Sequence, residues 1–281
     1  MNDTATRVAL VTGAGRGMGA DVALRLARDG FELAVADVRS CEESAEAIRS
    51  IGAAAVPYEC DIRDWTAVEE LVGAVERDQG PLHAAVQVAG VYRNVHFLDL
   101  DPEAWRLVLD VNLDGSFNVC RLAAAPMAAR GTGSIVFISS TASWLVWDES
   151  AHYTVSKAAI DGLVKGAAYE LGASGVRVNS VAPGTVRTPA TASELALPGV
   201  EEAEASATPL GRVGETSDIA EAVAFLCDPV RAAWVTGHTL VVDGGYSTHG
   251  QGSSFGRNVD TTVPARASPR PRAKRTVGGT S

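Results

Sequence analysis

The feature that most constrains this chain is a regular alternation of short apolar segments with amphipathic segments of helical period. Most of the short segments are apolar throughout, as in strands that are covered on both faces. Strands that alternate with helices favour an α/β fold with a doubly wound parallel sheet of about seven strands and right-handed crossovers. The strand candidates are Val8–Thr12, Glu32–Ala36, Ala53–Glu59, Ala84–Val88, Ser134–Ser139, Arg177–Val181 and Thr239–Val242.

The segments between these strands have the period of helices. A longer helix is expected to begin at Asp101 and Pro102, which form an N-terminal signal, and to run to about Arg130 with bends near Gly115 and Pro126. No linker or repeat interrupts the pattern, which predicts one domain. The other helix candidates are Met18–Arg28, Cys41–Ile51, Thr66–Arg77, Ala151–Ala173 and Thr216–Cys227.

Composition changes near the C-terminus. Residues 1–249 are predicted to form the domain, and residues 250–281 a disordered tail with six basic residues and one acid. The whole chain of 281 residues has a net charge of −10, which argues against nucleic acid as a partner. No apolar run is long enough to span a membrane. Four widely separated cysteines without ligand spacing predict reduced thiols, a cytoplasmic location and no metal.

The turn after the first strand is rich in glycine. It reads Thr-Gly-Ala-Gly-Arg-Gly-Met-Gly over residues 12–19 and opens the first helix. Gly13, Gly17 and Gly19, with Arg16 and Met18 between them, would let the backbone approach a pyrophosphate at the helix N-terminus. A strand, a glycine turn and a helix in this order indicate a Rossmann-type nucleotide-binding domain.

An acid follows this turn at the end of the second strand. Asp37 lies 18 residues after Gly19 and would accept hydrogen bonds from both ribose hydroxyls of an adenosine while repelling a 2′-phosphate. The residue therefore favours NAD over NADP as the cofactor. Arg16 and Arg39 are opposing signals, because either guanidinium would pair with a 2′-phosphate.

A second group of residues can move a proton. Tyr153 and Lys157 are four residues apart on a predicted helix and share one face, and Ser140 ends the fifth strand. An ammonium near a phenol lowers the phenol's pKa from its usual value of about 10 and makes it a usable proton donor and acceptor. Taken alone, a Tyr–Lys pair is more often an ordinary surface pair.

Together these motifs resemble the short-chain dehydrogenase/reductase family of single-domain oxidoreductases, over about residues 6–246. One departure is Gln87-Val88-Ala89-Gly90, where the family usually has Asn-Asn-Ala-Gly; we expect altered local stability rather than lost chemistry. The motifs that carry the resemblance are Thr12-Gly13-x-x-x-Gly17-x-Gly19, Asp61, Asn112, Ser140, Tyr153-x-x-x-Lys157 and Pro183-Gly184.

The resemblance implies an oxidoreductase that transfers a hydride between NAD(H) and a secondary alcohol or ketone. Tyr153 would be the general acid/base, and Lys157 would bind the nicotinamide ribose and lower the Tyr153 pKa. Ser140 would polarise the carbonyl, and Asn112 would hold a water that relays protons. Residues implied to surround the cofactor are Asp61 and Ile62 at the adenine, Ala89 and Gly90 at its ribose, and Pro183, Gly184, Val186 and Thr188 at the nicotinamide.

Candidate substrate residues are mostly aromatic or apolar and predict a substrate with a hydrophobic or cyclic body. They are Tyr92, Trp144, Trp147 and Leu195. The long segment after Thr188 is either a lid or an ordinary excursion of two helices. A 3-oxoacyl reductase and a dehydrogenase of a cyclic or aromatic alcohol both remain open, and the family's assembly implies a homotetramer or homodimer.

Two other classes of protein are weighed against the enzyme. One is a catalytically silent nucleotide sensor or scaffold with the same fold, because fold does not imply function. The complete set of Ser140, Tyr153 and Lys157 counts against it. The other is a sugar-nucleotide epimerase or dehydratase, which the glycine spacing disfavours.

Overall fold

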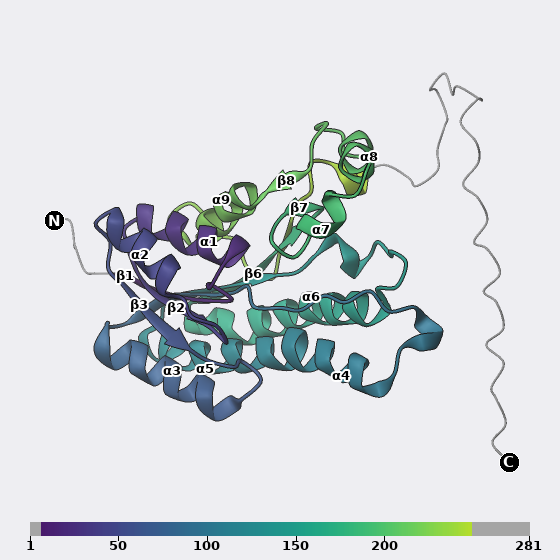
Figure 1. Cartoon of the computed structure of the whole chain (residues 1–281). Coiled ribbons are helices and arrows are strands. Elements are labelled where there is room, and N and C mark those ends of the chain that lie inside the picture. The colour runs from purple at the N-terminus through teal and green to yellow at the C-terminus, as the bar shows by residue number, and fades with distance from the viewer. Residues whose placement is uncertain (1–6, 249–281) are drawn as a thin grey trace, which may run out of the picture. The chain divides into compact units, whose positions relative to one another are not determined.

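A seven-stranded sheet forms the centre of the computed structural model, which describes residues 7–248 (Figure 1). All neighbouring strands are parallel, in the order β3-β2-β1-β4-β5-β6-β9. The doubly wound α/β class is therefore confirmed. The strands are β1 (Arg7–Thr12), β2 (Phe31–Asp37), β3 (Ala55–Glu59), β4 (Leu82–Gln87), β5 (Gly133–Ile138), β6 (Val176–Pro183) and β9 (Thr239–Val242).

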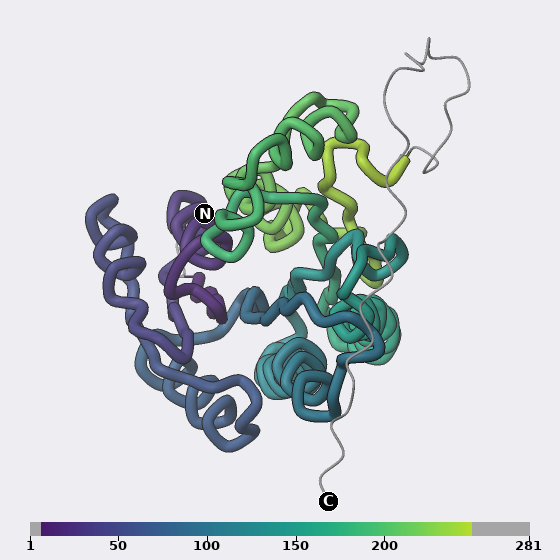
Figure 2. Tube along the Cα trace, turned by 45° about the vertical axis from the view of Figure 1, so that its right-hand side comes forward, coloured from purple at the N-terminus to yellow at the C-terminus, as the bar shows by residue number. Residues whose placement is uncertain are grey.

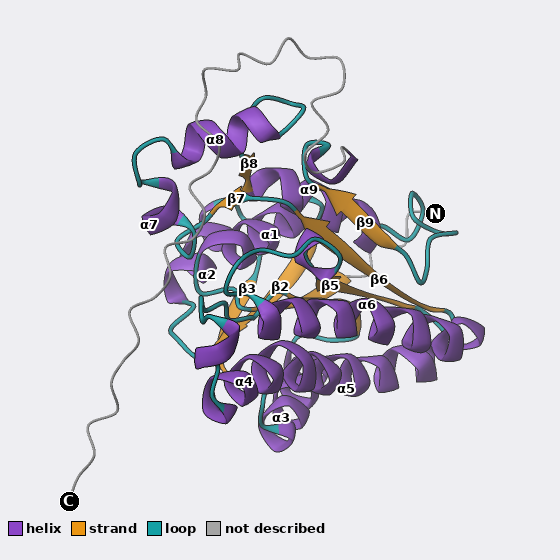
Figure 3. Ribbon diagram, turned by 90° about the vertical axis from the view of Figure 1, so that its right-hand side faces the viewer, coloured by secondary structure: helices purple, strands orange, loops and turns teal. Residues whose placement is uncertain are grey.

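Helices cover both faces of the sheet. One layer contains α1 (Gly17–Arg28), α2 (Glu42–Ser50) and α9 (Thr216–Cys227). The opposite layer contains α3 (Trp65–Asp78), α5 (Gly115–Arg130) and α6 (Ala151–Leu171), with α4 (Pro102–Leu109) beside α6 (Figure 3).

The sheet has an apolar core on each face. Along β1, Val8 and Leu10 are completely buried toward α3 and α5, while Ala9 and Val11 are completely buried toward α1 and α9. Successive side chains of a strand point to opposite faces, so a strand with two covered faces must be apolar at every position. Burial of a Val or Leu side chain contributes roughly 1.5–3 kcal/mol to folding, which is why these segments could be recognised.

The strand order brings the loops after β1 and β4 together at the carboxyl ends of the strands. β1 lies between β2 and β4, and the chain leaves β1 and β4 toward opposite layers. Loops at the carboxyl ends of the two strands therefore diverge there and leave room for a ligand. Figure 2 shows the turn after β1, in purple, beside the green segment that follows β6.

The predicted helix over residues 101–130 is divided. α4 ends at Leu109, a π-helical turn covers Asp110–Asp114, and α5 starts at Gly115. The break adjoins Gly115, where the sequence predicts a bend, whereas Pro126 lies inside α5. A π turn shifts the hydrogen-bond ladder by one residue, and this local change has no simple sequence signal.

The segment after β6 has secondary structure of its own. β7 (Val186–Arg187) pairs with β8 (Gly214–Glu215), and between them lie α7 (Ala192–Leu195) and α8 (Val200–Ala207). The two-residue strands are missing from the sequence prediction, because two residues show no periodicity.

Within residues 7–248, no helix combines the length and apolar character needed to cross a membrane. All four cysteines are buried and free of disulfide bonds in the structure. The compact unit ends at Thr248, so the predicted tail lies outside the described residues.

Candidate active site

The turn after β1 is closely packed backbone. Gly13 and Gly17 have positive φ angles of 69° and 57°. A Cβ atom on Gly13 would lie 2.6 Å from the Ala89 nitrogen, and one on Gly19 would lie 2.0 Å from the Gly13 oxygen. A side chain at either position would therefore collide with backbone, and at Gly13 only glycine satisfies both the conformation and the contact.

Helix α1 begins directly after this turn. Its N-cap residue, Arg16, is exposed and makes no side-chain capping hydrogen bond, and Met18 packs against the apolar core. The first N–H groups and the positive end of the helix dipole thus remain available to an anion. A pyrophosphate fits this arrangement.

Asp37 ends β2 beside the same turn. Its carboxylate accepts hydrogen bonds from the backbone N–H groups of Gly15, at 3.2 Å, and Arg39, at 3.1 Å. The side chains of Arg16 and Arg39 are exposed, and neither takes part in an ion pair among residues 7–248. The structure thus brings together the acid and the two opposing arginines that the sequence indicates.

The turn after β3 carries Asp61 and Ile62. Asp61 forms an ion pair with Arg63 at 2.6 Å, and hydrogen bonds from that guanidinium hold the pKa of Asp61 below its usual range. Ile62 is buried against Gly115, and Asn118 Nδ2 donates to its carbonyl at 3.0 Å. These contacts fix the turn without using the backbone N–H of Asp61 or Ile62.

The altered motif after β4 packs in two ways. Gln87 Nε2 donates to the carbonyl of Ala89 at 2.8 Å, and Val88 packs into the core beneath α1. The buried hydroxyl of Thr12, which is paired with Gln87 in the sheet, has no hydrogen-bond partner in the structure. Gly90 lies next to Asn112, whose Oδ1 would be 3.2 Å from an added Cβ.

Asn112 lies in the π turn and is almost completely buried. Its Oδ1 accepts from the Val91 N–H at 2.8 Å, and its Nδ2 donates to the Val91 carbonyl at 3.0 Å. Nδ2 is also 3.1 Å from Ser156 Oγ on α6, and that hydroxyl donates to the Tyr153 carbonyl. The amide therefore ties the loop after β4 to the helix that carries Tyr153; a role in a proton relay stays a prediction.

Ser140, Tyr153 and Lys157 meet at the carboxyl end of β5. Ser140 starts a short 3₁₀ turn, and its Oγ accepts from the Ala142 N–H at 3.1 Å. The same hydroxyl lies near enough to the Tyr153 phenol to lower the pKa of that phenol. Lys157 Nζ lies 5.5 Å from the centre of the Tyr153 ring and donates to the Ile138 carbonyl at 2.8 Å. Positions separated by one turn of α6 thus face the same strand end.

Burial dominates the titration of both groups. It raises the pKa of Tyr153 to about 12, against the lowering effect of the Ser140 hydrogen bond. It lowers the pKa of Lys157 to about 8, because a low dielectric disfavours the ammonium. The pKa of Tyr153 therefore lies above the ordinary value of a phenol, opposite to the direction that the resemblance implies.

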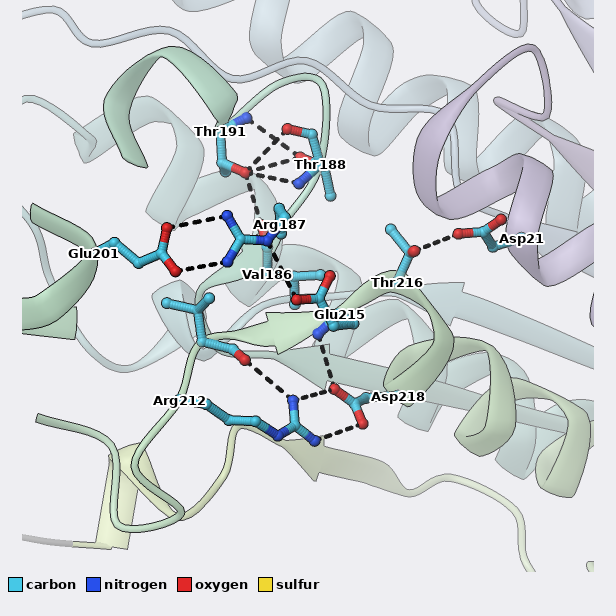
Figure 4. Close-up of polar contacts among 11 residues, drawn as sticks. Asp21, Val186, Arg187, Thr188, Thr191, Glu201, Arg212, Glu215, Thr216 and Asp218 are labelled. Atoms are coloured by element: carbon cyan, nitrogen blue, oxygen red, sulfur yellow. Dashed lines mark hydrogen bonds and ion pairs between the residues drawn. The ribbon is translucent and has the colours of Figure 1, made fainter. Parts of the chain in front are cut away.

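The end of β6 continues the same edge. Thr141 Oγ1 donates to the Pro183 carbonyl at 3.2 Å, and the Gly184 N–H donates to Val242 at 3.2 Å. Val186 is buried in β7, and Thr188 exchanges hydrogen bonds with Thr191 (Figure 4). All four residues implied at the nicotinamide lie along this one stretch.

The segment after Thr188 approaches the glycine turn. A Cβ atom on Gly17 would lie 2.8 Å from Pro189 Cδ. Arg187 pairs with Glu201 at 2.6 Å and with Glu215 at 3.2 Å, and Arg212 pairs with Asp218 at 2.6 Å (Figure 4). We call residues 188–213 the docked segment. It contains the two helices of one sequence interpretation, and its action as a lid stays a prediction.

The candidate substrate residues have different surroundings. Tyr92 contacts the Tyr153 ring, with 5.0 Å between centroids and 77° between planes. Trp144 is 44% exposed directly after the turn that Ser140 starts, and Trp147 is half-buried. Leu195 is 6% exposed, so its side chain is buried.

Sequence reasoning missed a hydrogen bond between Asn94 Nδ2 and Glu194 Oε1, at 2.9 Å. It joins the loop after β4 to α7 across 100 positions of the chain, and no local pattern could have indicated it. It also missed Ser156, although this residue lies inside the Tyr153–Lys157 motif. Among residues 7–248, no group of three or more His, Cys, Asp and Glu side chains is placed to hold a metal ion.

A parallel sheet with a glycine cradle at its first turn and a Ser–Tyr–Lys group at the adjoining edge defines a nucleotide-dependent oxidoreductase fold. The chain belongs to the short-chain dehydrogenase/reductase family. The family model described as enoyl-(acyl carrier protein) reductase matches residues 13–247.

The matches to several named relatives extend over nearly the whole length of each relative. The chain is 41% identical over 249 residues to the A-factor type gamma-butyrolactone 1′-reductase of Streptomyces virginiae, covering 86% of this chain and 95% of the relative. It is 37% identical over 246 residues to the cis-4-hydroxycyclohexanecarboxylate dehydrogenase of Sinomonas cyclohexanicum, covering 86% and 97%. A gluconate 5-dehydrogenase of Burkholderia cenocepacia, solved in complex with NADP and tartrate, matches with a TM-score of 0.82 and 31% identity over 88% and 96% of the two chains.

Proposed function

We propose that this chain is an NAD(H)-dependent oxidoreductase that interconverts a secondary alcohol and a ketone, with Tyr153 as the general acid/base. The observation that carries the proposal is the meeting of Ser140, Tyr153 and Lys157 at the strand edge beside the glycine turn. The phenol lies close to the Ser140 hydroxyl and the Lys157 amine, at the same carboxyl edge of the sheet as the glycine turn.

The residues present fit a nicotinamide dinucleotide. Glycine at positions 13 and 19 lets backbone pack against backbone in this turn, and the first N–H groups of α1 would face the phosphate groups. Asp37 would hold the adenosine ribose, and Lys157 the nicotinamide ribose. When bound, the cofactor supplies or accepts the hydride. Further residues proposed to contact it are Asp61, Ile62, Ala89, Gly90, Pro183, Gly184, Val186 and Thr188.

The chain's own groups would handle the proton. Ser140 Oγ would donate a hydrogen bond to the substrate oxygen, and Tyr153 would give its proton to the same oxygen as an alkoxide forms there. A pKa of about 12 keeps the phenol protonated at neutral pH, which suits the donor role in ketone reduction. A charged Lys157 near the ring would favour the phenolate that remains.

The choice between NAD and NADP depends on Asp37. Its carboxylate is held by two backbone N–H groups and would repel a 2′-phosphate, which supports NAD. Arg16 and Arg39 oppose this choice, and one structural relative was solved with NADP. Titrations with NADH and NADPH at fixed salt, followed by nicotinamide fluorescence, decide between the cofactors; tighter binding of NADPH would overturn the NAD assignment.

We infer a substrate with a hydrophobic or cyclic body. The aromatic side chains of Tyr92, Trp144 and Trp147 near the Ser140 edge support this class. The names of two relatives, a butyrolactone reductase and a cyclohexanecarboxylate dehydrogenase, also refer to ring compounds. Suitable probes are cis-4-hydroxycyclohexanecarboxylate and a ketone attached to a lactone ring.

A homodimer or homotetramer is proposed as the assembly. An apolar groove of about 500 Å³ lies between α5 and α6. A second copy would bury it, and analytical ultracentrifugation would show a single monomeric species if this proposal is wrong. Residues lining the groove include Phe117, Cys120, Ala124, Ala128, Leu163 and Ala167.

The test of the acid/base role is Tyr153→Phe, with Tyr169→Phe as the matched control. Tyr169 lies on the same helix and is 90% exposed. We expect turnover of the best probe to fall by about 10²–10⁴-fold in Tyr153→Phe, with the Kd for NADH retained. Turnover near that of the wild type would overturn the acid/base role of Tyr153. If the wild type does not bind NADH, the proposed oxidoreductase function is wrong.

A further inference from the structure

Tyr92 flanks the proposed catalytic tyrosine from a different part of the chain. It follows β4, whereas Tyr153 lies on α6, and the two rings meet edge to face with centroids 5.0 Å apart. Such pairs prefer this orientation because the positive ring edge faces the negative ring face. Lys157 also lies near the Tyr153 ring, but on the same helix. Tyr92 is thus the contact that ties the phenol to the loop after β4.

The loop is held firmly on both sides of Tyr92. Asn112 bonds both the N–H and the carbonyl of Val91, and the Val95 N–H donates to the Glu149 carbonyl at 2.9 Å. Within the described range, Glu149 is the one non-glycine residue with a positive φ, at 62°. A strained conformation of this kind persists only where surrounding contacts maintain it.

The third attachment of this loop comes from the docked segment. Asn94 Nδ2 donates to Glu194 Oε1 at 2.9 Å. Burial and the Glu194 charge raise the pKa of the Tyr92 phenol, and a hydrogen bond with Asn94 lowers it. Asn94 follows Tyr92 by two residues, so its hydrogen bond to Glu194 holds the loop that carries the Tyr92 ring. A chain of neighbours leads from α7 through Glu194, Asn94 and Tyr92 to Tyr153.

We propose that Tyr92 is a positioning residue for Tyr153, and that the Asn94–Glu194 hydrogen bond sets the position of Tyr92 when residues 188–213 are docked. This role rests on the proposed function, because it acts through Tyr153. Proton transfer requires the phenol to lie within hydrogen-bond distance of the substrate oxygen, and a small displacement slows that step. Docking of the segment over a substrate thereby fixes the catalytic phenol in place.

The first experiment compares Tyr92→Ala with Tyr92→Phe and with Tyr169→Ala. The probe is cis-4-hydroxycyclohexanecarboxylate or the lactone ketone, whichever the wild type turns over faster. We expect kcat to fall by about tenfold in Tyr92→Ala, with most of it restored in Tyr92→Phe, which keeps the ring. The Kd for NADH should not change. A rise in KM at constant kcat would make Tyr92 only a wall of the substrate site and would overturn the proposal.

The second experiment tests the contact with α7. Glu194→Gln keeps an oxygen that accepts from Asn94 and should retain the wild-type kcat. Glu194→Ala and Asn94→Ala should each lower kcat by about threefold, and the double variant should be no slower than either, because both changes remove the same interaction. Additive losses of kcat in the double variant would show that Asn94 and Glu194 act separately. That result would overturn the claim that their hydrogen bond sets the position of Tyr92.

A third readout needs no substrate. Tyrosine labelled with ¹³C at the ζ carbon reports the titration of Tyr153, whose resonance is identified by its loss in Tyr153→Phe. We expect the pKa of Tyr153 to fall in Tyr92→Ala, because the ring that shields the phenol from water is gone. An unchanged pKa together with an unchanged kcat would overturn the positioning role. An active Tyr153→Phe would instead overturn the proposed function, so the two failures are distinguishable.

Discussion

The two sides of the candidate site are held by different kinds of interaction. The turn after β1 is fixed by backbone packing, with Gly19 against Gly13 and Gly13 against Ala89. The segment after β6 is fixed by exposed ion pairs of Arg187 and Arg212 (Figure 4). Steric contacts tolerate almost no change, whereas surface ion pairs are weak and are screened by salt. From this comparison we predict that the turn after β1 is rigid and that the docked segment can open.

The largest expected effect comes from a methyl group in the rigid turn. Gly19→Ala would place Cβ 2.0 Å from the Gly13 oxygen, so we expect it to lower the free energy of unfolding by about 3 kcal/mol or more, or to abolish NADH binding. Gly73→Ala is the control, because nothing lies within 4 Å of that position in α3. The control should be stabilised by about 0.5–1 kcal/mol. Urea unfolding measures the free energy of unfolding of both variants. Equal changes in the two variants would show that the glycine turn is no more rigid than an exposed helix position.

The nucleotide side should also be sensitive to charge. Asp37→Ala removes the proposed acceptor of the ribose hydroxyls, so we expect the Kd for NADH to rise by about 10–100-fold, as for loss of a charged hydrogen bond. NADPH should bind more tightly than to the wild type, because repulsion of its 2′-phosphate is removed. Fluorescence titration measures both constants. Unchanged values would show that Asp37 serves only the Gly15 turn.

The substrate side should respond differently. Arg187→Ala removes the ion pair with Glu201 of the docked segment and the pair with Glu215 of β8, and we expect KM to rise by about fivefold without a measurable change in the unfolding midpoint. Raising the salt concentration should increase the KM of the wild type but not that of the variant. Arg77→Ala, which breaks an exposed pair on α3, is the control. A loss of folding in Arg187→Ala would show that this segment is as rigid as the glycine turn.

The smallest effect is expected at Thr12, the last residue of β1 before the glycine turn. The buried Thr12 hydroxyl has no partner, so Thr12→Val should raise the free energy of unfolding by about 1 kcal/mol. Thermal denaturation of the cofactor-free protein measures it. Destabilisation instead would reveal a hydrogen bond that the hydroxyl makes in solution.

Sequence reasoning succeeded where one residue type has one physical cause. The strands of the main sheet were predicted correctly because both of their faces are buried. Gly13, Asp37, Ser140, Tyr153 and Lys157 were singled out through their motifs, and their roles stay predictions. Sequence reasoning failed where contacts between distant parts of the chain determine a residue's surroundings.

The Asn94–Glu194 hydrogen bond joins residues 100 positions apart. The direction of the Tyr153 pKa follows from burial, which the spacing of Tyr153 and Lys157 does not reveal. Leu195 is buried, which its composition did not reveal, and its contact with a substrate stays a prediction.

The position of β1 has a consequence for how the protein is made. β1 is the first strand of the described chain to leave the ribosome, yet it lies in the middle of the sheet between β2 and β4. The edge that pairs with β4 remains open until synthesis passes Leu82. During that interval, a strand with an apolar centre exposes unpaired N–H and C=O groups, which is a hazard for association between nascent chains. We therefore expect chaperone dependence to be greatest for nascent chains that end between β3 and β4.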